Sequence, residues 1–137
     1  MATGVARTAT GISVSIARDA ALVRTVRLIA AAVARRTGQD EEFVEEVRLA
    51  VGEACALMVG SGAAPELRGG GPITVRMHID DRLGVDVQSD GPVVAEDAPD
   101  SDVDGVEPWA LLRGLIDDFS ISREGSSTTL SMSWPLA

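Results

Sequence analysis

A single carboxylate stands in an otherwise apolar run near the middle of the chain. Between Arg48 and Glu66, the only ionisable residues are Glu53 and Cys55. A carboxylate in such surroundings must find a partner, reach solvent or take a raised pKa, because desolvation disfavours its charged form. A raised pKa suits a general base. Glu53 is therefore the candidate catalytic residue, and the alternative is a structural carboxylate that pairs with an arginine at the rim of the core.

Two other patterns resemble metal sites but lack essential ligands. Asp100, Asp102 and Asp104, followed by a glycine, match the opening of a calcium-binding loop. That loop requires a glutamate at its twelfth position, which is Leu111 in this chain. His78 is the only histidine, and neither a second imidazole nor a pair of cysteines accompanies it to form a zinc site. We therefore expect no metal site.

The charge of the chain excludes several classes of partner. The net charge is −9, so we expect no direct binding to nucleic acid, which depends on clustered basic residues. No apolar run reaches the ~18 residues of a membrane span, and the start of the chain lacks the apolar stretch of a secretory signal. We therefore expect a cytoplasmic protein that does not bind membranes. The first 36 residues nevertheless carry six arginines against one aspartate, a charge of +5 that favours a protein partner.

Hydrophobic periodicity predicts the elements that must position Glu53. The first helix is expected from Asp19 to Gly38, and Asp40 is expected to cap a second helix that carries Glu53. A third helical stripe runs from Pro108 to Phe119. Alternating apolar residues predict a strand over 12–16, a hairpin over 73–87 and a final hairpin over 121–134.

These elements predict a single domain over residues 1–137. Their order, β-α-α-β-β-α-β-β, is typical of an α+β two-layer sandwich, with a mixed, mostly antiparallel sheet and three helices on one face. Residues 89–107 contain seven acidic residues and no basic one. We expect that segment to be a flexible acidic loop.

Three stretches of this chain resemble one bacterial family. They are Leu-Val-Arg at Leu22 to Arg24, Val-Arg-Leu-Ala-Val-Gly-Glu-Ala at Val47 to Ala54, and Leu-Ile-Asp-Asp-Phe at Leu115 to Phe119. Together with the element order, they resemble the anti-sigma-factor branch of the histidine-kinase-like (GHKL) ATPases, serine kinases that regulate sigma factors by partner switching. The resemblance implies that Glu53 occupies the general-base position, and that residues 89–107 replace the loop that covers ATP.

The nucleotide-binding positions implied by the resemblance are degenerate. Active members bind ATP-Mg²⁺ and hold the metal with an asparagine one turn after the glutamate, where this chain has Leu57. Their D-x-G motif binds the adenine amino group through its aspartate. The best alignment places Ser89 at that aspartate and retains the glycine as Gly91, and a register shifted by one would instead place Asp90 at the aspartate and Pro92 at the glycine, so the motif is broken in both registers. The second glycine motif falls near Val106 and Pro108. We therefore expect no cofactor and a vestigial Glu53.

The resemblance also implies partners. An arginine at the place of Arg24 belongs to the family's surface for the sigma factor and for its competing antagonist, a STAS-type domain. Arg24 and Arg27 are therefore the candidate partner-binding residues, and the alternative is a solvated basic helix face. The leading hypothesis is a non-catalytic anti-sigma factor, with a homodimer as a family expectation. The rival hypothesis is an active serine kinase that phosphorylates the antagonist.

Overall fold

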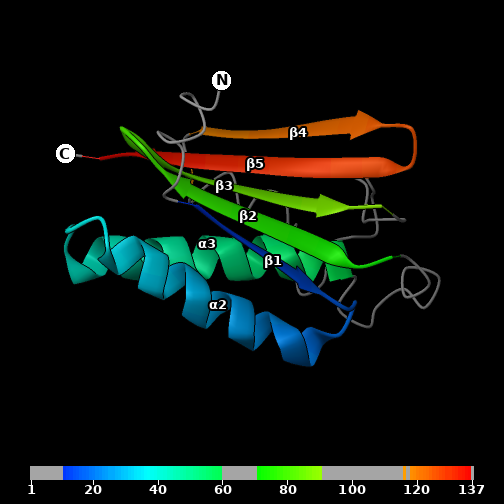
Figure 1. Cartoon of the computed structure of the whole chain (residues 1–137), viewed down its shortest axis with the longest axis horizontal. Helices are drawn as coiled ribbons and strands as arrows, with labels where there is room; N and C mark the ends of the chain where they lie inside the picture. Colours follow the sequence, from blue (N-terminus) through cyan, green and yellow to red (C-terminus); the bar gives the residue numbers. More distant parts are fainter. Residues whose placement is uncertain (1–10, 60–70, 91–115, 117, 137) are drawn as a thin grey trace, which may run out of the picture.

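The computed structural model describes residues 11–59, 71–90, 116 and 118–136. Within them, five strands form one sheet and two helices lie together on one side of it (Figure 1). The predicted α+β class is confirmed. No helix in these ranges is long and apolar enough to cross a membrane.

The sheet has the strand order β1-β2-β3-β5-β4, and every neighbouring pair is antiparallel. The expected parallel component is absent from these five strands. Two helices connect β1 to β2, so the chain reverses direction three times and returns antiparallel, whereas a single crossover helix, with two reversals, would give a parallel pair. The strands are β1 (Gly11–Ile16), β2 (Ile73–Ile79), β3 (Arg82–Ser89), β4 (Asp118–Glu124) and β5 (Ser127–Pro135).

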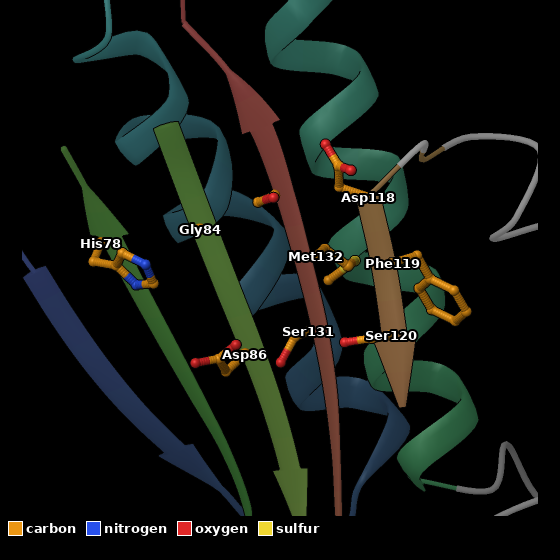
Figure 2. Close-up of a pocket in the computed structure, with 9 residues that line it drawn as sticks. His78, Gly84, Asp86, Asp118, Phe119, Ser120, Ser131 and Met132 are labelled. Carbon is orange, nitrogen blue, oxygen red and sulfur yellow. The ribbon is translucent and has the colours of Figure 1, made fainter. Parts of the chain in front are cut away.

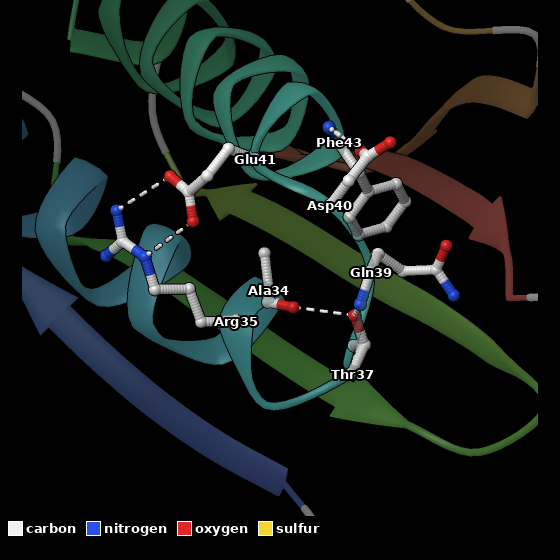
Figure 3. A network of polar contacts seen from close by, with 7 residues as sticks. All are labelled: Ala34, Arg35, Thr37, Gln39, Asp40, Glu41 and Phe43. Atoms are coloured by element: carbon white, nitrogen blue, oxygen red, sulfur yellow. Dashed lines mark hydrogen bonds and ion pairs between the residues drawn. The ribbon is translucent and has the colours of Figure 1, made fainter.

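Both helices, α2 (Ala20–Arg35) and α3 (Glu41–Val59), start and stop where the local sequence predicts. The Asp19 side chain accepts a hydrogen bond from the amide of Ala21 at the start of α2. Gly38 has a φ of 81°, the left-handed conformation that suits glycine after a helix. The Asp40 carboxylate accepts from the amide of Phe43 at 2.9 Å and caps α3 (Figure 3).

The core lies between the helices and one face of the sheet. Helix α2 packs on β2, and α3 packs on β2 and β3. The alternating strand residues that face the helices are buried, including Val75, Met77, Val85, Val87, Leu130 and Met132. The opposite face of the sheet carries polar side chains such as Arg76 and His78, both exposed. The sheet therefore has one apolar face and one polar face.

Two expected segments differ from the structure or fall outside it. Asp118 and Phe119 were expected to end the third helix, but they are the first residues of β4 and pair with Ser133 and Met132. The rest of that helix, 108–115 and 117, lies outside the described residues. Ser89 was expected to begin the acidic loop but is the last residue of β3, and 91–107 also lie outside the described part.

Candidate functional site

The side chains of Glu53 and Leu57 project from α3 one turn apart, in different surroundings. Glu53 is half-buried, and it makes no ion pair with any residue in the described ranges. The predicted pairing of Glu53 with an arginine at the core rim is therefore not found there. Leu57 is 7% exposed and belongs to the hydrophobic core. The position one turn after the candidate base is thus an apolar packing site.

Two buried hydroxyl groups mark the end of the sheet that lies under the carboxyl end of α3. Ser89, at the end of β3, is fully buried, and Thr128 of β5 is 5% exposed. The two residues are cross-strand partners. They are the only buried polar residues in the part of the chain that the structure describes. A buried polar pair at the end of an apolar face is unusual enough to indicate a specific local environment.

That environment is provided by Arg18, which lies between β1 and α2. Its Nε donates a hydrogen bond to the carbonyl of Gly71 at 3.0 Å. One terminal nitrogen donates to the carbonyl of Met58 and the other to Ser89 Oγ. Burial lowers the pKa of Arg18, and the negative charge of Asp90 opposes that effect. We call Arg18, Gly71, Ser89, Thr128 and the Met58 carbonyl the Ser89 corner.

The Ser89 corner contains hydrogen-bond acceptors that are already bound to a cation. The Arg18 guanidinium donates to three neutral oxygen atoms, the Ser89 hydroxyl and the Gly71 and Met58 carbonyls, and Thr128 contributes a second buried hydroxyl from the neighbouring strand. No group of three histidine, cysteine, aspartate or glutamate residues within the described ranges could hold a metal ion. The corner can therefore position segments of the chain, but within the described residues it supplies no metal ligand set.

The exposed face of α2 is basic with an apolar centre. Arg24 and Arg36 are exposed, and Leu28, one turn after Arg24, is 63% exposed. Arg27 lies differently, because it is half-buried and its stem crosses Gly52 of α3, where a Cβ would lie 2.1 Å from its Nε. The two predicted partner-binding arginines are therefore not equivalent: Arg24 is on the open face, and Arg27 is in the seam between the helices.

A shallow hollow of about 430 Å³ lies on the polar face of the sheet, away from α2 and α3 (Figure 2). At the floor of the hollow, the His78 imidazole lies over Gly84, which has no side chain. A Cβ at residue 84 would be 2.3 Å from His78 Nε2, so the imidazole occupies the space that a side chain would need. The lining of the hollow also includes Asp86, Asp118, Phe119, Met132 and three serines. None of the predicted site residues lines this hollow.

A family model described as a histidine kinase-like ATPase domain matches residues 16–134, which is most of the chain. The chain belongs to the histidine kinase-like ATPase family. Its fold is also that of a solved structure entitled "The crystal structure of the RsbU and RsbW domains of Rv1364c from Mycobacterium tuberculosis", with a TM-score of 0.66 and 18% sequence identity. The similarity covers 92% of this chain and 32% of that one, so this chain spans about a third of that protein. A search of curated proteins gives no match.

As a member of the histidine kinase-like ATPase family, the chain contains Glu53, Leu57 and Ser89 within the matched stretch. Gly91, Val106 and Pro108 lie outside the described residues. Sequence reasoning missed Arg18 and Thr128. Thr128 had a detectable signal, because it is a polar residue at an inward position of the alternation that continues through Leu130 and Met132. Arg18 had none, because its partners are 40 to 71 residues away in sequence.

Proposed function

We propose that this chain is an anti-sigma factor that sequesters a sigma factor and is released by a STAS-type antagonist, without productive binding of ATP. Membership of the histidine kinase-like ATPase family supports the class, and the similar fold of a structure that contains an RsbW domain supports the partner-switching branch. Binding of the sigma factor and of the antagonist would be mutually exclusive.

The observation that carries the non-catalytic assignment is the burial of Leu57. Phosphoryl transfer depends on positioning and on a metal that neutralises the phosphate charge. A leucine offers no metal ligand, and at 7% exposure its side chain is committed to the core. Arg18, which donates to Ser89 Oγ, supports the same conclusion at the other end of the site. Without a bound nucleotide there is no phosphoryl group to transfer, so Glu53 has no reaction in which to serve as a base.

The exposed face of α2 supports the partner assignment. Arg24 offers a guanidinium to a carboxylate, and the neighbouring Leu28 offers an apolar anchor. A partner surface with acidic residues around an apolar pocket would match both groups. We assign Arg24 to this contact, and Arg27 to the packing of α2 on α3, which orients the surface.

The test is a binding titration with a purified sigma factor and a STAS-domain antagonist from the same genome. Arg24→Glu should weaken the affinity for the sigma factor by roughly 10-fold or more, because charge reversal turns an attraction into a repulsion. Arg123→Glu is the matched control, because Arg123 is also exposed but lies on β4, and it should leave the affinity unchanged. Equal effects of the two substitutions, or no binding to either partner, would refute the proposal.

The rival function, an active serine kinase, is tested in the same system. The chain is incubated with ATP-Mg²⁺ and the antagonist, and phosphorylation is read as a phosphate mass shift. We expect no shift. A shift that disappears in Glu53→Gln would establish the kinase and overturn the non-catalytic assignment.

A further inference from the structure

Arg18 connects four segments that are distant in sequence. It follows β1, and its guanidinium reaches the end of α3 at Met58, the residues before β2 at Gly71 and the end of β3 at Ser89. Met58 is the penultimate residue of α3, so its carbonyl belongs to the last turn, whose carbonyls have no partner within the helix. A cation is also favoured at this end of a helix. Arg18 therefore serves as a cap for α3.

The hydrogen bonds of Arg18 also determine which ligand the Ser89 corner can accept. A guanidinium donates five N–H groups in one plane and accepts none. It therefore presents donors and a positive charge to a corner whose oxygen atoms are all acceptors. An entering amino group is itself a hydrogen-bond donor. It would have to compete with the Arg18 guanidinium for the Ser89 hydroxyl and the Met58 and Gly71 carbonyls, and the guanidinium already fills that space.

We infer that Arg18 is a built-in occupant of the Ser89 corner, which fills the position of a nucleobase amino group and closes this end of the site to adenine nucleotides. This inference rests on the proposed function, because the resemblance places adenine recognition at Ser89. Removal of Arg18 would take a cationic donor away from the Met58 and Gly71 carbonyls and from the Ser89 hydroxyl. The opened corner would select a planar, N–H-rich group such as a guanidinium or an aminopurine edge.

The first experiment is chemical rescue of Arg18→Ala by methylguanidinium, read as the melting temperature. Loss of the hydrogen bonds to Gly71, Met58 and Ser89 should lower the melting temperature by roughly 4–10 °C. Methylguanidinium chloride should restore part of that loss in a saturable manner, whereas methylammonium chloride should not. Arg76→Ala is the matched control, because Arg76 is exposed and, among the described residues, its side chain hydrogen-bonds only to Gln88, at 3.0 Å. Absence of a selective, saturable rescue in Arg18→Ala would overturn the inference.

The second experiment measures adenosine binding, which needs the base position and not the degenerate phosphate site. By calorimetry, the wild type should give no binding heat, and the double variant Arg18→Ala with Ser89→Asp should bind adenosine. If Arg18→Ala does not fold, Arg18→Gln with Ser89→Asp replaces it, because glutamine is too short to reach all three acceptors. Adenosine binding by the wild type, or none by the folded double variant, would contradict the inference.

The two proposals fail in different ways. If adenosine enters the corner only after Arg18 is removed but no sigma factor binds, the assignment of Arg18 stands and the anti-sigma function fails. If sigma factor binds through Arg24 but the wild type already binds adenosine, the anti-sigma function stands and the assignment of Arg18 fails.

Discussion

At the scale of single residues, α3 carries Glu53, the candidate general base, and Leu57, which stands where the resemblance implies an asparagine. Glu53 was detectable from the sequence because a lone carboxylate in an apolar helix is conspicuous. The surroundings of Glu53 and Leu57 could not be predicted from the sequence, because they depend on how α3 is rotated against the sheet. The structure places Leu57 in the core and leaves Glu53 half-buried. The apolar side chain at 57 therefore contributes to stability.

Substitution of Leu57 by asparagine should be costly without restoring nucleotide chemistry. Leu57→Asn removes buried apolar surface and buries an amide, so we expect the free energy of unfolding to fall by about 2–4 kcal/mol. Leu49→Asn is the matched control on the same helix, because Leu49 is 46% exposed, and it should change stability by less than about 1 kcal/mol. Urea denaturation measures both. Equal losses, or ATP-Mg²⁺ binding gained by Leu57→Asn, would contradict this account.

At the scale of elements, local signals were sufficient for helix ends but not for every choice between helix and strand. The cap at Asp40 and the limits of the first helix at Asp19 and Gly38 are local properties, and they were predicted from the sequence. Phe119 was assigned to a helix because it lies three residues after Ile116, yet it also lies two residues before Ile121. Both periods fit the same apolar residues. Phe119 adopts the strand conformation because it pairs with Met132 of β5, and the local sequence does not reveal that pairing.

The cap of α3 can be tested by substitution of Asp40. Asp40→Ala removes the acceptor for the Phe43 amide, so we expect the free energy of unfolding to fall by about 1 kcal/mol, within a range of roughly 0.5–2 kcal/mol. Asp40→Asn retains an acceptor oxygen and should stay close to the wild type. Thermal or urea unfolding compares the three proteins. A loss in Asp40→Asn as large as in Asp40→Ala would show that the negative charge, rather than the cap hydrogen bond, matters.

At the scale of the whole molecule, composition gives this chain an unusually simple alkaline titration. All twelve basic residues are arginines, and the chain has no tyrosine and one cysteine. Arginine stays protonated far above neutral pH, so Cys55 has the lowest ordinary pKa of the side chains that ionise above about pH 8. Cys55 is buried, and desolvation raises its pKa to about 12, while the nearby charge of Arg27 opposes the shift.

The alkaline limb of the stability curve should therefore report the ionisation of Cys55. Above about pH 9 the unfolded chain releases the thiol proton, whereas the folded chain keeps it until about pH 12. The folded state then binds more protons, so the free energy of unfolding falls as pH rises, by up to about 1.4 kcal/mol per pH unit. Urea denaturation between pH 8 and 11 measures the slope. In Cys55→Ala the slope should vanish, and an equal slope in both proteins would mean that another group controls alkaline unfolding.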